Sequence, residues 1–522
     1  MLLGNEKGHR RNQDLRGTSS LPPLTFVARM TDVQRYGLFV GGEFVPAHSG
    51  ATFPVHNPHN DEVYAQVAEA REDDVEDAIA AARSAFEGPW GALTPKERGK
   101  LLLRLARLIQ DQSESISRLE AKNSGHPIRD VRRFDLVRTV DWFEYFAGMT
   151  TKIQGDVIPS SFHGVLNYTL REPLGVVAQI VPWNFPLMFV AWNIAPALAA
   201  GNTVILKPAE YTPLSALEIA RLTKEAGFPP GTVNVVPGKG SIAGAALARH
   251  PGVDKICFTG SVQVGQQIMR EAATNLKRPL LELGGKGPNI IFDDADLDAA
   301  VQGSLFAAFH NQGQACIAGS RILLHESVWD KFLDAFLPRV RSLRIGDPLD
   351  EKSQMGPLTS KDHQKRVLEY VDIAKGEGAE ILYGGKRPDT PETSRGYYVL
   401  PTLVRAEDPG MRICQEEVFG PFITVTPFAK EEEAVAIANG VPYGLGAGLW
   451  TQNLRRAHGL AAQLRAGMVW INSYKLVDPA SPFGGMKMSG IGREMGFETM
   501  REYTQVKSVW VGYDFEPWRW PE

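Results

Sequence analysis

The sequence predicts an α/β protein built on parallel sheets. Between residues 176 and 292 the apolar segments VVAQIV, TVILKP, VNVVPG and KICFTG have strand character, and a segment of helical periodicity follows each one. PLLELGG and NIIFDD are then predicted as two more strands. This alternation indicates a parallel sheet with helices on both faces, whose ligands bind beyond the carboxyl ends of the strands.

A second alternating set runs from the predicted strand RILLH to the predicted strand MVWINS. The segments at 165–171 and near 503–511 lie outside both sets and alternate polar with β-branched or aromatic residues. We expect these two strands to form a small arm that pairs with another subunit, because an exposed edge strand needs a cover.

Nearer the N-terminus, LFVGGEFV predicts a hairpin that turns at two glycines. VEDAIAAARSAFEG predicts one helix, and residues 96–125 predict a second, longer one. Each ends on a glycine, Gly88 or Gly125, which suits a helix C-cap. Residues 1–33 are polar and Arg-rich without periodicity. We interpret them as a disordered tail, or as an over-long start of a sequence whose real first residue is Met30. A transit peptide is the alternative, weakened by two acidic residues.

The composition restricts the class of protein. A chain of 522 residues suggests two or three domains, and 43% hydrophobic with 22% charged residues is an ordinary globular mix. The net charge of −4 argues against a nucleic acid or an anionic membrane as the main partner. The uncharged stretch after Glu172 is cut by three prolines, which argues against a membrane span. Three cysteines without a CxxC pair exclude a disulfide framework and a zinc knuckle, and indicate a reduced, cytoplasmic protein.

Polar residues follow the predicted strands. Asn184 in VPWNFP could donate to a developing oxyanion, or cap the following helix. Lys207 and Glu210 in TVILKPAE could bind an adenosine ribose, or form a solvated charge pair. In FTGSVQVG, Gly260 and Gly265 could leave N–H groups free for a phosphate, or serve the turn alone.

Two further segments carry candidate reactive groups. Glu282 ends an apolar run, so it is a candidate general base of raised pKa, or the partner of Lys286. Cys316 lies in the polar loop HNQGQACIAGSR, where N–H dipoles would lower its pKa, although an inert buried cysteine is the alternative. In QEEVFGPF, Glu417 and Phe419 could hold a second ribose and pack against a planar ring, or merely pack the loop. The other two cysteines, at 257 and 414, are predicted to be structural.

Seven segments, in their order along the chain, resemble the aldehyde dehydrogenase superfamily, in its NAD(P)-dependent, non-acylating branch. The segments are PWNFP, KPAE, FTGS-x-x-VG, LELGGK, NQGQ-x-C, EEVFGP and SPFGG-x-K-x-SG-x-GRE. The resemblance runs from about Tyr36 to about Tyr513. It implies a Rossmann-type NAD-binding domain (34–157 and 172–284), an α/β catalytic domain (285–485), and a small β oligomerisation arm with the C-terminal tail (158–171 and 498–522).

The resemblance also implies roles for the candidates. Cys316 would attack the aldehyde carbon, and the Asn184 side chain with the Cys316 backbone N–H would hold the oxyanion. Glu282 would activate the water that hydrolyses the thioester, which implies a free acid as product instead of transfer to coenzyme A. The partner would be a small aldehyde, the assembly a homodimer or homotetramer, and no metal, nucleic acid or membrane is expected.

The implied cofactor is NAD. Lys207 and Glu210 would bind the adenosine ribose, and NADP is less favoured because Glu210 would repel a 2′-phosphate. The other positions that the resemblance implies are Trp183 beside the cleft, Gly260, Ser261 and Gly265 at the pyrophosphate turn, Glu417 on the nicotinamide ribose, and Phe419 beside the ring.

The positions that would line the aldehyde channel differ from the aromatic pattern of many relatives. His310 stands where many relatives have an aromatic residue, and Lys475 sits near the mouth. We expect a medium-sized, partly apolar aldehyde, with a carboxylate or other polar tail; semialdehyde and betaine-aldehyde types are the alternatives. The channel positions are Phe185, Phe189, Trp192, His310, Ile317, Val477 and Phe483.

Two other classes remain for comparison. A cysteine hydrolase would pair Cys316 with His310, but it leaves LELGGK, KPAE and FTGS without a purpose. A non-catalytic relative would be expected to lack the nucleophile or the base, and both are present.

Overall fold

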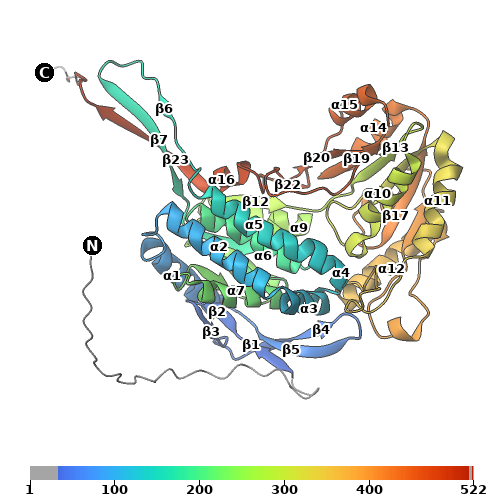
Figure 1. The fold of residues 1–522 in the computed structure, drawn as a ribbon, viewed down its shortest axis with the longest axis horizontal. Coiled ribbons are helices and arrows are strands. Elements are labelled where there is room, and N and C mark those ends of the chain that lie inside the picture. The colour runs from blue at the N-terminus through green and yellow to red at the C-terminus, as the bar shows by residue number, and fades with distance from the viewer. Residues whose placement is uncertain (1–32, 517–519, 521–522) are drawn as a thin grey trace, which may run out of the picture.

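The structure is a computed structural model that describes residues 33–516 and residue 520. Two large sheets form the body of the molecule, and helices cover both (Figure 1). Apart from Val33, the segment predicted to be a disordered tail lies outside the described residues. Among the described residues, no helix combines the length and the apolar character that a membrane crossing needs.

The first sheet has eight strands, in the order β22-β12-β11-β8-β9-β10-β2-β3. The five from β12 to β10 are parallel, as the alternating pattern predicted, while β22 and the β2–β3 hairpin are antiparallel additions. The strands span Leu38–Val40 (β2), Glu43–Val45 (β3), Val176–Ile180 (β8), Thr203–Lys207 (β9), Val233–Val235 (β10), Lys255–Thr259 (β11), Arg278–Glu282 (β12) and Gly490–Ile491 (β22).

Helices cover both faces of this sheet, because alternate residues of each buried strand point to opposite sides. Val177 and Val204 face a core made with α2, α5, α6 and α7, whereas Val176 and Ile205 face a core made with α1, α8 and α9. These helices span Glu72–Glu87 (α1), Pro95–Asp111 (α2), Leu136–Met149 (α5), Pro186–Ala199 (α6), Leu214–Ala226 (α7), Ala245–Arg249 (α8) and Val262–Ala272 (α9).

The second sheet has seven strands, in the order β15-β16-β17-β14-β13-β19-β20, all parallel except for β15. The chain passes from the first sheet to the second between Glu282 and Pro288. The strands span Pro288–Ile291 (β13), Arg321–His325 (β14), Glu380–Tyr383 (β15), Thr402–Arg405 (β16), Phe422–Phe428 (β17), Gly446–Trp450 (β19) and Met468–Ile471 (β20). The helices around them span Leu297–Phe309 (α10), Trp329–Arg341 (α11), Lys361–Gly376 (α12), Arg412–Gln415 (α13), Glu431–Asn439 (α14) and Leu454–Ala461 (α15).

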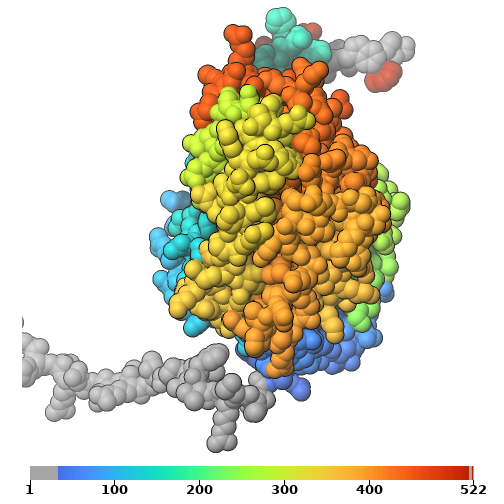
Figure 2. Space-filling model, turned by 90° about the vertical axis from the view of Figure 1, so that its right-hand side faces the viewer, coloured from blue at the N-terminus to red at the C-terminus, as the bar shows by residue number. Residues whose placement is uncertain are grey.

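A three-stranded arm projects from the body (Figure 1). It consists of β6 (Val157–Ile158), β7 (Val165–Pro173) and β23 (Thr504–Gly512), and β7 pairs antiparallel with β23 along its whole length. Seen from the side, the arm stands at one end of the molecule, and the N-terminal strands lie at the other (Figure 2). The two strands predicted outside both α/β sets therefore pair with each other.

The remaining elements are short. A small sheet joins β1 (Gln34–Tyr36), β5 (Glu62–Ala68) and β4 (Thr52–Asn57), and β18 (Tyr443–Gly444) pairs with β21 (Met486–Lys487). The other helical segments span Ser113–Ser124 (α3), Ile128–Asp130 (α4), Val131–Asp135 (η1), Gly240–Gly244 (η2), His310–Gly313 (η3), Glu326–Val328 (η4), Pro391–Thr393 (η5) and Glu498–Glu502 (α16).

Some local predictions need correction. The single helix expected over 96–125 is two helices, α2 and α3, because Gln112 between them leaves helical geometry at φ −102°, ψ 21°. Gly125 ends α3 in the left-handed conformation at φ 80°, as a C-cap glycine should, but Gly88 ends α1 at φ −117° and is not left-handed. The hairpin is confirmed, and its two turn glycines have φ of 62° and 86°.

Asn202 ties the first sheet to the arm. Its side chain is fully buried; Oδ1 accepts hydrogen bonds from the N–H groups of Leu174 (2.8 Å) and Gly175 (3.0 Å), and Nδ2 donates to the carbonyls of Ala197 (3.2 Å) and Tyr503 (3.0 Å). One side chain thus joins the link between β7 and β8, the end of α6 and the residue that precedes β23.

We predict that Asn202→Ala lowers the free energy of unfolding by about 2–4 kcal/mol, because buried backbone groups lose their partners. Urea unfolding followed by tryptophan fluorescence measures the change. The exposed Gln452→Ala is the control and should shift the midpoint little. An Asn202→Ala protein as stable as the control would contradict this role.

Candidate active site

Two cavities meet at Cys316. The first, here called the cleft, has a volume of about 490 Å³ and contains Asn184, Glu282 and Cys316 in its wall. The second, the apolar pocket, has a volume of about 140 Å³ and lies beyond Cys316 and Phe189, which line both. A group bound in the cleft and another bound in the pocket would therefore both reach the thiol.

The loop that carries Cys316 has an unusual backbone. It leaves the end of α10 through Asn311, Gln312 and Gly313, three consecutive residues with φ of 54°, 54° and 71°. Left-handed conformations are costly for residues with a side chain and persist only where contacts enforce them. Here the Gln312 amide enforces them, donating to the carbonyls of Gly125 (2.8 Å) and Pro357 (2.9 Å).

Asn184 is fastened to the same loop. Its Nδ2 donates to the Gln314 carbonyl at 3.0 Å, and its own carbonyl accepts from Asn311 Nδ2 at 2.6 Å. It does not cap α6, since the N-cap position belongs to Phe185, which makes no side-chain capping bond. The capping alternative is thus excluded, and one N–H of the Asn184 amide is left to face the cleft.

The pKa of the Cys316 thiol is raised to about 12, mainly by burial and also by the charges of Glu417 and Glu282. The Ile317 N–H and Lys475 act in the opposite direction but do not prevail. The expectation of a lowered pKa is therefore wrong: the carboxylates that share the cavity were not visible in the local sequence. Cys316 keeps its proton at neutral pH unless a base removes it.

Glu282 ends β12 inside the cleft wall, with only 2% of its surface exposed. Neither carboxyl oxygen has a hydrogen-bond partner among the described residues. Burial, reinforced by nearby Glu494, raises its pKa well above the usual range, and Arg493 opposes the shift. The alternative partner, Lys286, makes no such pair, because its Nζ also has no partner in the described part of the chain. Glu282 is thus a buried carboxyl of raised pKa, so its carboxylate form is a stronger base than an exposed one.

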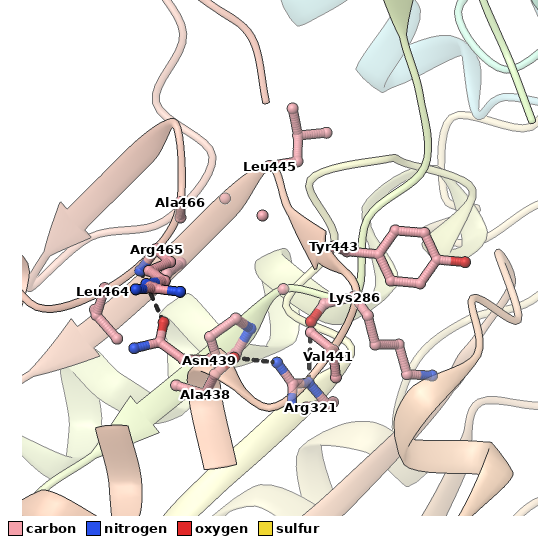
Figure 3. Close-up of a pocket in the computed structure, with 15 residues that line it drawn as sticks. Lys286, Arg321, Ala438, Asn439, Val441, Tyr443, Leu445, Leu464, Arg465 and Ala466 are labelled. Carbon is pink, nitrogen blue, oxygen red and sulfur yellow. Dashed lines mark hydrogen bonds between the residues drawn. The ribbon is translucent and has the colours of Figure 1, made fainter. Parts of the chain in front are cut away.

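The turn after Glu282 is held from below by Arg321 (Figure 3). The buried guanidinium donates to the carbonyls of Lys286, Ile437 and Ala438, each at 2.9 Å. In the same turn, the Gly285 N–H donates to Glu417 Oε1 at 2.8 Å. The LGGK turn and Glu417 are therefore positioned together at the edge of the cleft.

The N-terminus of α9 opens onto the cleft. Ser261 is its N-cap and accepts from the Val264 N–H at 3.4 Å, and Gly260, Val262 and Gln263 also line the cavity. The first turn contains no acidic residue, so its free N–H groups and dipole favour an anion. At Gly265 a Cβ would lie 2.7 Å from Leu283, so glycine lets α9 approach the LELGG segment.

Aromatic rings form another wall of the cleft. Trp183 and Phe419 meet edge to face at 5.4 Å between ring centroids, and His363 lies 4.9 Å from Trp183. The His363 Nε2 donates to the Phe419 carbonyl at 2.6 Å, which fixes the loop carrying Glu417. Burial raises the pKa of Glu417 to about 7.

Lys207 and Glu210 form an ion pair, with Nζ 3.2 Å from Oε2. A charge pair was the alternative to ribose binding for these two residues. The pair is not a simple solvated one, because Lys207 is buried and Glu210 Oε1 accepts from the Gly240 N–H at 2.6 Å. Neither residue lines the cleft, although their neighbour Tyr211 does. Their assignment to a ribose stays a prediction.

The apolar pocket brings together all seven positions proposed for the aldehyde channel. The His310 Nε2 has no hydrogen-bond partner among the described residues, and the ring contacts Phe185, Phe306 and His126. The nucleophile–base hydrogen bond that a Cys316–His310 hydrolase needs is therefore absent from the described contacts.

Sequence reasoning missed part of each cavity. Helix α12 and its N-cap contribute five residues to the cleft, and none of them was a candidate from the sequence. Helix α5 contributes Arg138 and Trp142 to the pocket, far from any quoted motif. No local pattern marks these positions. The α12 residues are Ser360, Asp362, His363, Arg366 and Tyr370, of which Ser360 is the N-cap.

Comparison with known proteins agrees with this geometry. The family model described as "Aldehyde dehydrogenase family" matches residues 44–509. An aldehyde dehydrogenase from Emericella nidulans is 46% identical over 477 residues, covering 91% of this chain and 95% of the relative. PnpE from Pseudomonas sp. WBC-3 is 55% identical with a TM-score of 0.91, covering 93% of this chain and 99% of that one, and has also been solved with nicotinamide adenine dinucleotide. An NAD⁺ complex of a Bacillus cereus aldehyde dehydrogenase is 48% identical with a TM-score of 0.90, covering 92% and 97%.

The chain belongs to the aldehyde dehydrogenase family of oxidoreductases. The resemblance drawn from the seven motifs is confirmed, as are the predicted fold class and the class of enzyme. The alternative of a cysteine hydrolase is thereby removed.

We predict that Cys316 alkylates slowly at pH 7 and that the rate rises about tenfold per pH unit up to at least pH 10, because the thiolate is the reactive form and the thiol pKa is raised. Iodoacetamide labelling followed by peptide mass spectrometry measures the rate without cofactor. The Cys316→Ser variant gives the background labelling of Cys257 and Cys414. A plateau below pH 8 would show that the thiolate is stabilised after all.

Proposed function

We propose that this protein oxidises an aldehyde to a carboxylic acid with NAD, through a thioester on Cys316. The observation that carries the proposal is the meeting of the cleft and the apolar pocket at one thiol, with Asn184 and Glu282 in the wall. A cofactor in one cavity and an aldehyde in the other would both reach that sulfur.

The cleft fits NAD in the character of its wall. The N-terminus of α9 at Ser261 suits the pyrophosphate, and Glu417 suits a ribose hydroxyl beside the Trp183 and Phe419 rings. The ribose role predicted for Glu210 would disfavour the 2′-phosphate of NADP, so we expect NAD to be the preferred form. When bound, NAD supplies the hydride acceptor.

The protein's own groups perform the other steps. The Cys316 sulfur bonds to the aldehyde carbon, and the oxygen becomes an oxyanion held by the Asn184 amide and the Cys316 backbone N–H. Because the thiol is protonated at neutral pH, its proton passes to water in the cleft as the sulfur attacks. After oxidation the carbon remains attached to sulfur as a thioester. Glu282 then takes a proton from the water that attacks the thioester carbon. The carbon–sulfur bond breaks, the acid is released, and the proton passes from Glu282 to the sulfur, which restores the thiol.

We predict that Glu282→Gln gives a burst of NADH equal to about one per active site and a steady-state rate at least about 100-fold below wild type, because hydrolysis loses its base. Stopped-flow absorbance of NADH with an aldehyde panel measures both phases. Cys316→Ala should show neither phase while NAD still binds, and the exposed Glu225→Gln serves as the matched control. Normal steady-state turnover in Glu282→Gln would remove Glu282 as the base.

We also propose that the arm joins copies of the chain into a dimer or tetramer. The arm, including the turn between β6 and β7, exposes large apolar side chains that an isolated molecule would leave in water. Val157 is 76% exposed, Phe162 58% and Trp510 57%. A second copy supplies the natural cover for such an arm.

We predict that Trp510→Glu shifts the protein toward smaller species, because a charge replaces a buried contact between copies. Sedimentation velocity across a concentration series measures the assembly. Leu454→Glu changes an even more exposed apolar residue, on α15 outside the arm; it is the control and should keep the wild-type assembly. A wild-type protein that sediments as a monomer would refute the arm's role.

A further inference from the structure

The apolar pocket contains a cation without a counter-ion. Lys475 follows β20 in a left-handed backbone conformation, φ 58°, and lines the pocket with Phe306, which its Nζ approaches to 5.9 Å from the ring centroid. The Nζ is shielded from solvent and has no hydrogen-bond or ion-pair partner among the described residues. Burying an unpaired ammonium is costly, and the cost is relieved only by losing the proton or by binding an anion.

The other charged groups of the pocket wall are already engaged. The Asp135 carboxylate accepts from His126 Nδ1 at 2.6 Å, and the Arg138 guanidinium donates to the Val477 carbonyl. No carboxylate of the described chain lies within ion-pair distance of Lys475. Among the described residues that line the pocket, Asp135 is the one acidic residue. The wall therefore holds more positive than negative charge.

His310 adds a second polar group to the same wall. Its imidazole sits among aromatic rings and makes no hydrogen bond with a described residue. Burial, together with the charges of His126 and Lys475, holds the pKa of His310 well below its usual range, so the ring is neutral and keeps one N–H to donate. An ammonium and a neutral N–H donor beside one another complement the oxygens of an anion.

We propose that the aldehyde oxidised by this protein carries a carboxylate at the end remote from the aldehyde carbon, bound by the Lys475 ammonium with His310 as a second donor. The proposal rests on the proposed function and names its substrate class, the semialdehydes of dicarboxylic acids. Lys475 and Cys316 line one small pocket and interact electrostatically, so the spacer between the two ends is short. A trimethylammonium tail would meet Lys475 with like charge, which sets the betaine-aldehyde alternative aside.

Buried Lys475 also has a pKa lowered to about 7, mainly by burial. A carboxylate beside it would favour the charged form and recover part of that cost. A competing role is to assist the Cys316 thiol, whose pKa Lys475 lowers slightly. The two roles differ in one measurable respect: help to the thiol acts on every aldehyde, whereas binding a tail acts only on acidic ones.

The test compares aldehydes of matched shape, 4-formylbenzoate with its methyl ester and succinate semialdehyde with its methyl ester. In the wild type we expect kcat/KM for each acid to exceed that of its ester about 10- to 100-fold, the value of one charge-assisted hydrogen bond. Lys475→Met should bring this ratio to about one, and His310→Phe should lower it less. Lys365→Met, on the exposed face of α12, should keep the wild-type ratio.

A ratio near one in the wild type, or equal losses for acid and ester in Lys475→Met, would overturn the proposal while leaving aldehyde oxidation intact. If no aldehyde yields NADH although NAD binds, the proposed function fails and the tail site is judged by binding alone. Calorimetry with terephthalate, the product of 4-formylbenzoate oxidation, and with its monomethyl ester provides that measurement. Terephthalate binding that Lys475→Met loses supports the site, and absent or unchanged binding refutes it.

Discussion

The arrangement of the site depends on one strained turn. Asn311, Gln312 and Gly313 adopt left-handed conformations in succession, and this places Cys316 at the contact of the two cavities. The turn persists because both halves of the molecule hold it: Gln312 bonds to Gly125, from the N-terminal helices, and to Pro357, from the second α/β unit. A Cβ on Gly313 would lie 2.2 Å from the Gly420 carbonyl oxygen, so glycine is required at the tightest point. The position of the thiol is therefore a property of the assembled fold.

The second feature of the site is the amount of ionisable surface that it buries without partners. Glu282, Lys286 and Lys475 all have polar atoms that no described group satisfies. Each is costly to the folded state, and each has a pKa displaced toward its neutral form. Groups of this kind are retained where a ligand or a reaction makes use of them. The proposed base and the proposed tail-binding group share this physical origin.

The motifs located the candidate residues well because each follows a strand of a parallel sheet. Asn184, Ser261 and Glu282 stand after β8, β11 and at the end of β12, and the carboxyl ends of parallel strands meet at one edge. Residues such as His363 and Arg138 escaped prediction because they enter from helices whose local pattern is an ordinary amphipathic one. Their role follows from where α12 and α5 pack, which depends on contacts between segments far apart along the chain.

The sequence by itself determined the fold class, the family and the residues available for chemistry, because strand–helix alternation and ordered motifs are local patterns. Tertiary structure decided the electrostatics. It showed that the pKa of Cys316 is raised, mainly because the thiol is buried and also because Glu417 and Glu282 arrive from other strands and loops. It also showed that Lys286 does not neutralise Glu282 and that Lys475 has no counter-ion in the described pocket. Burial and charge proximity are sums over the whole fold, and no window of sequence contains them.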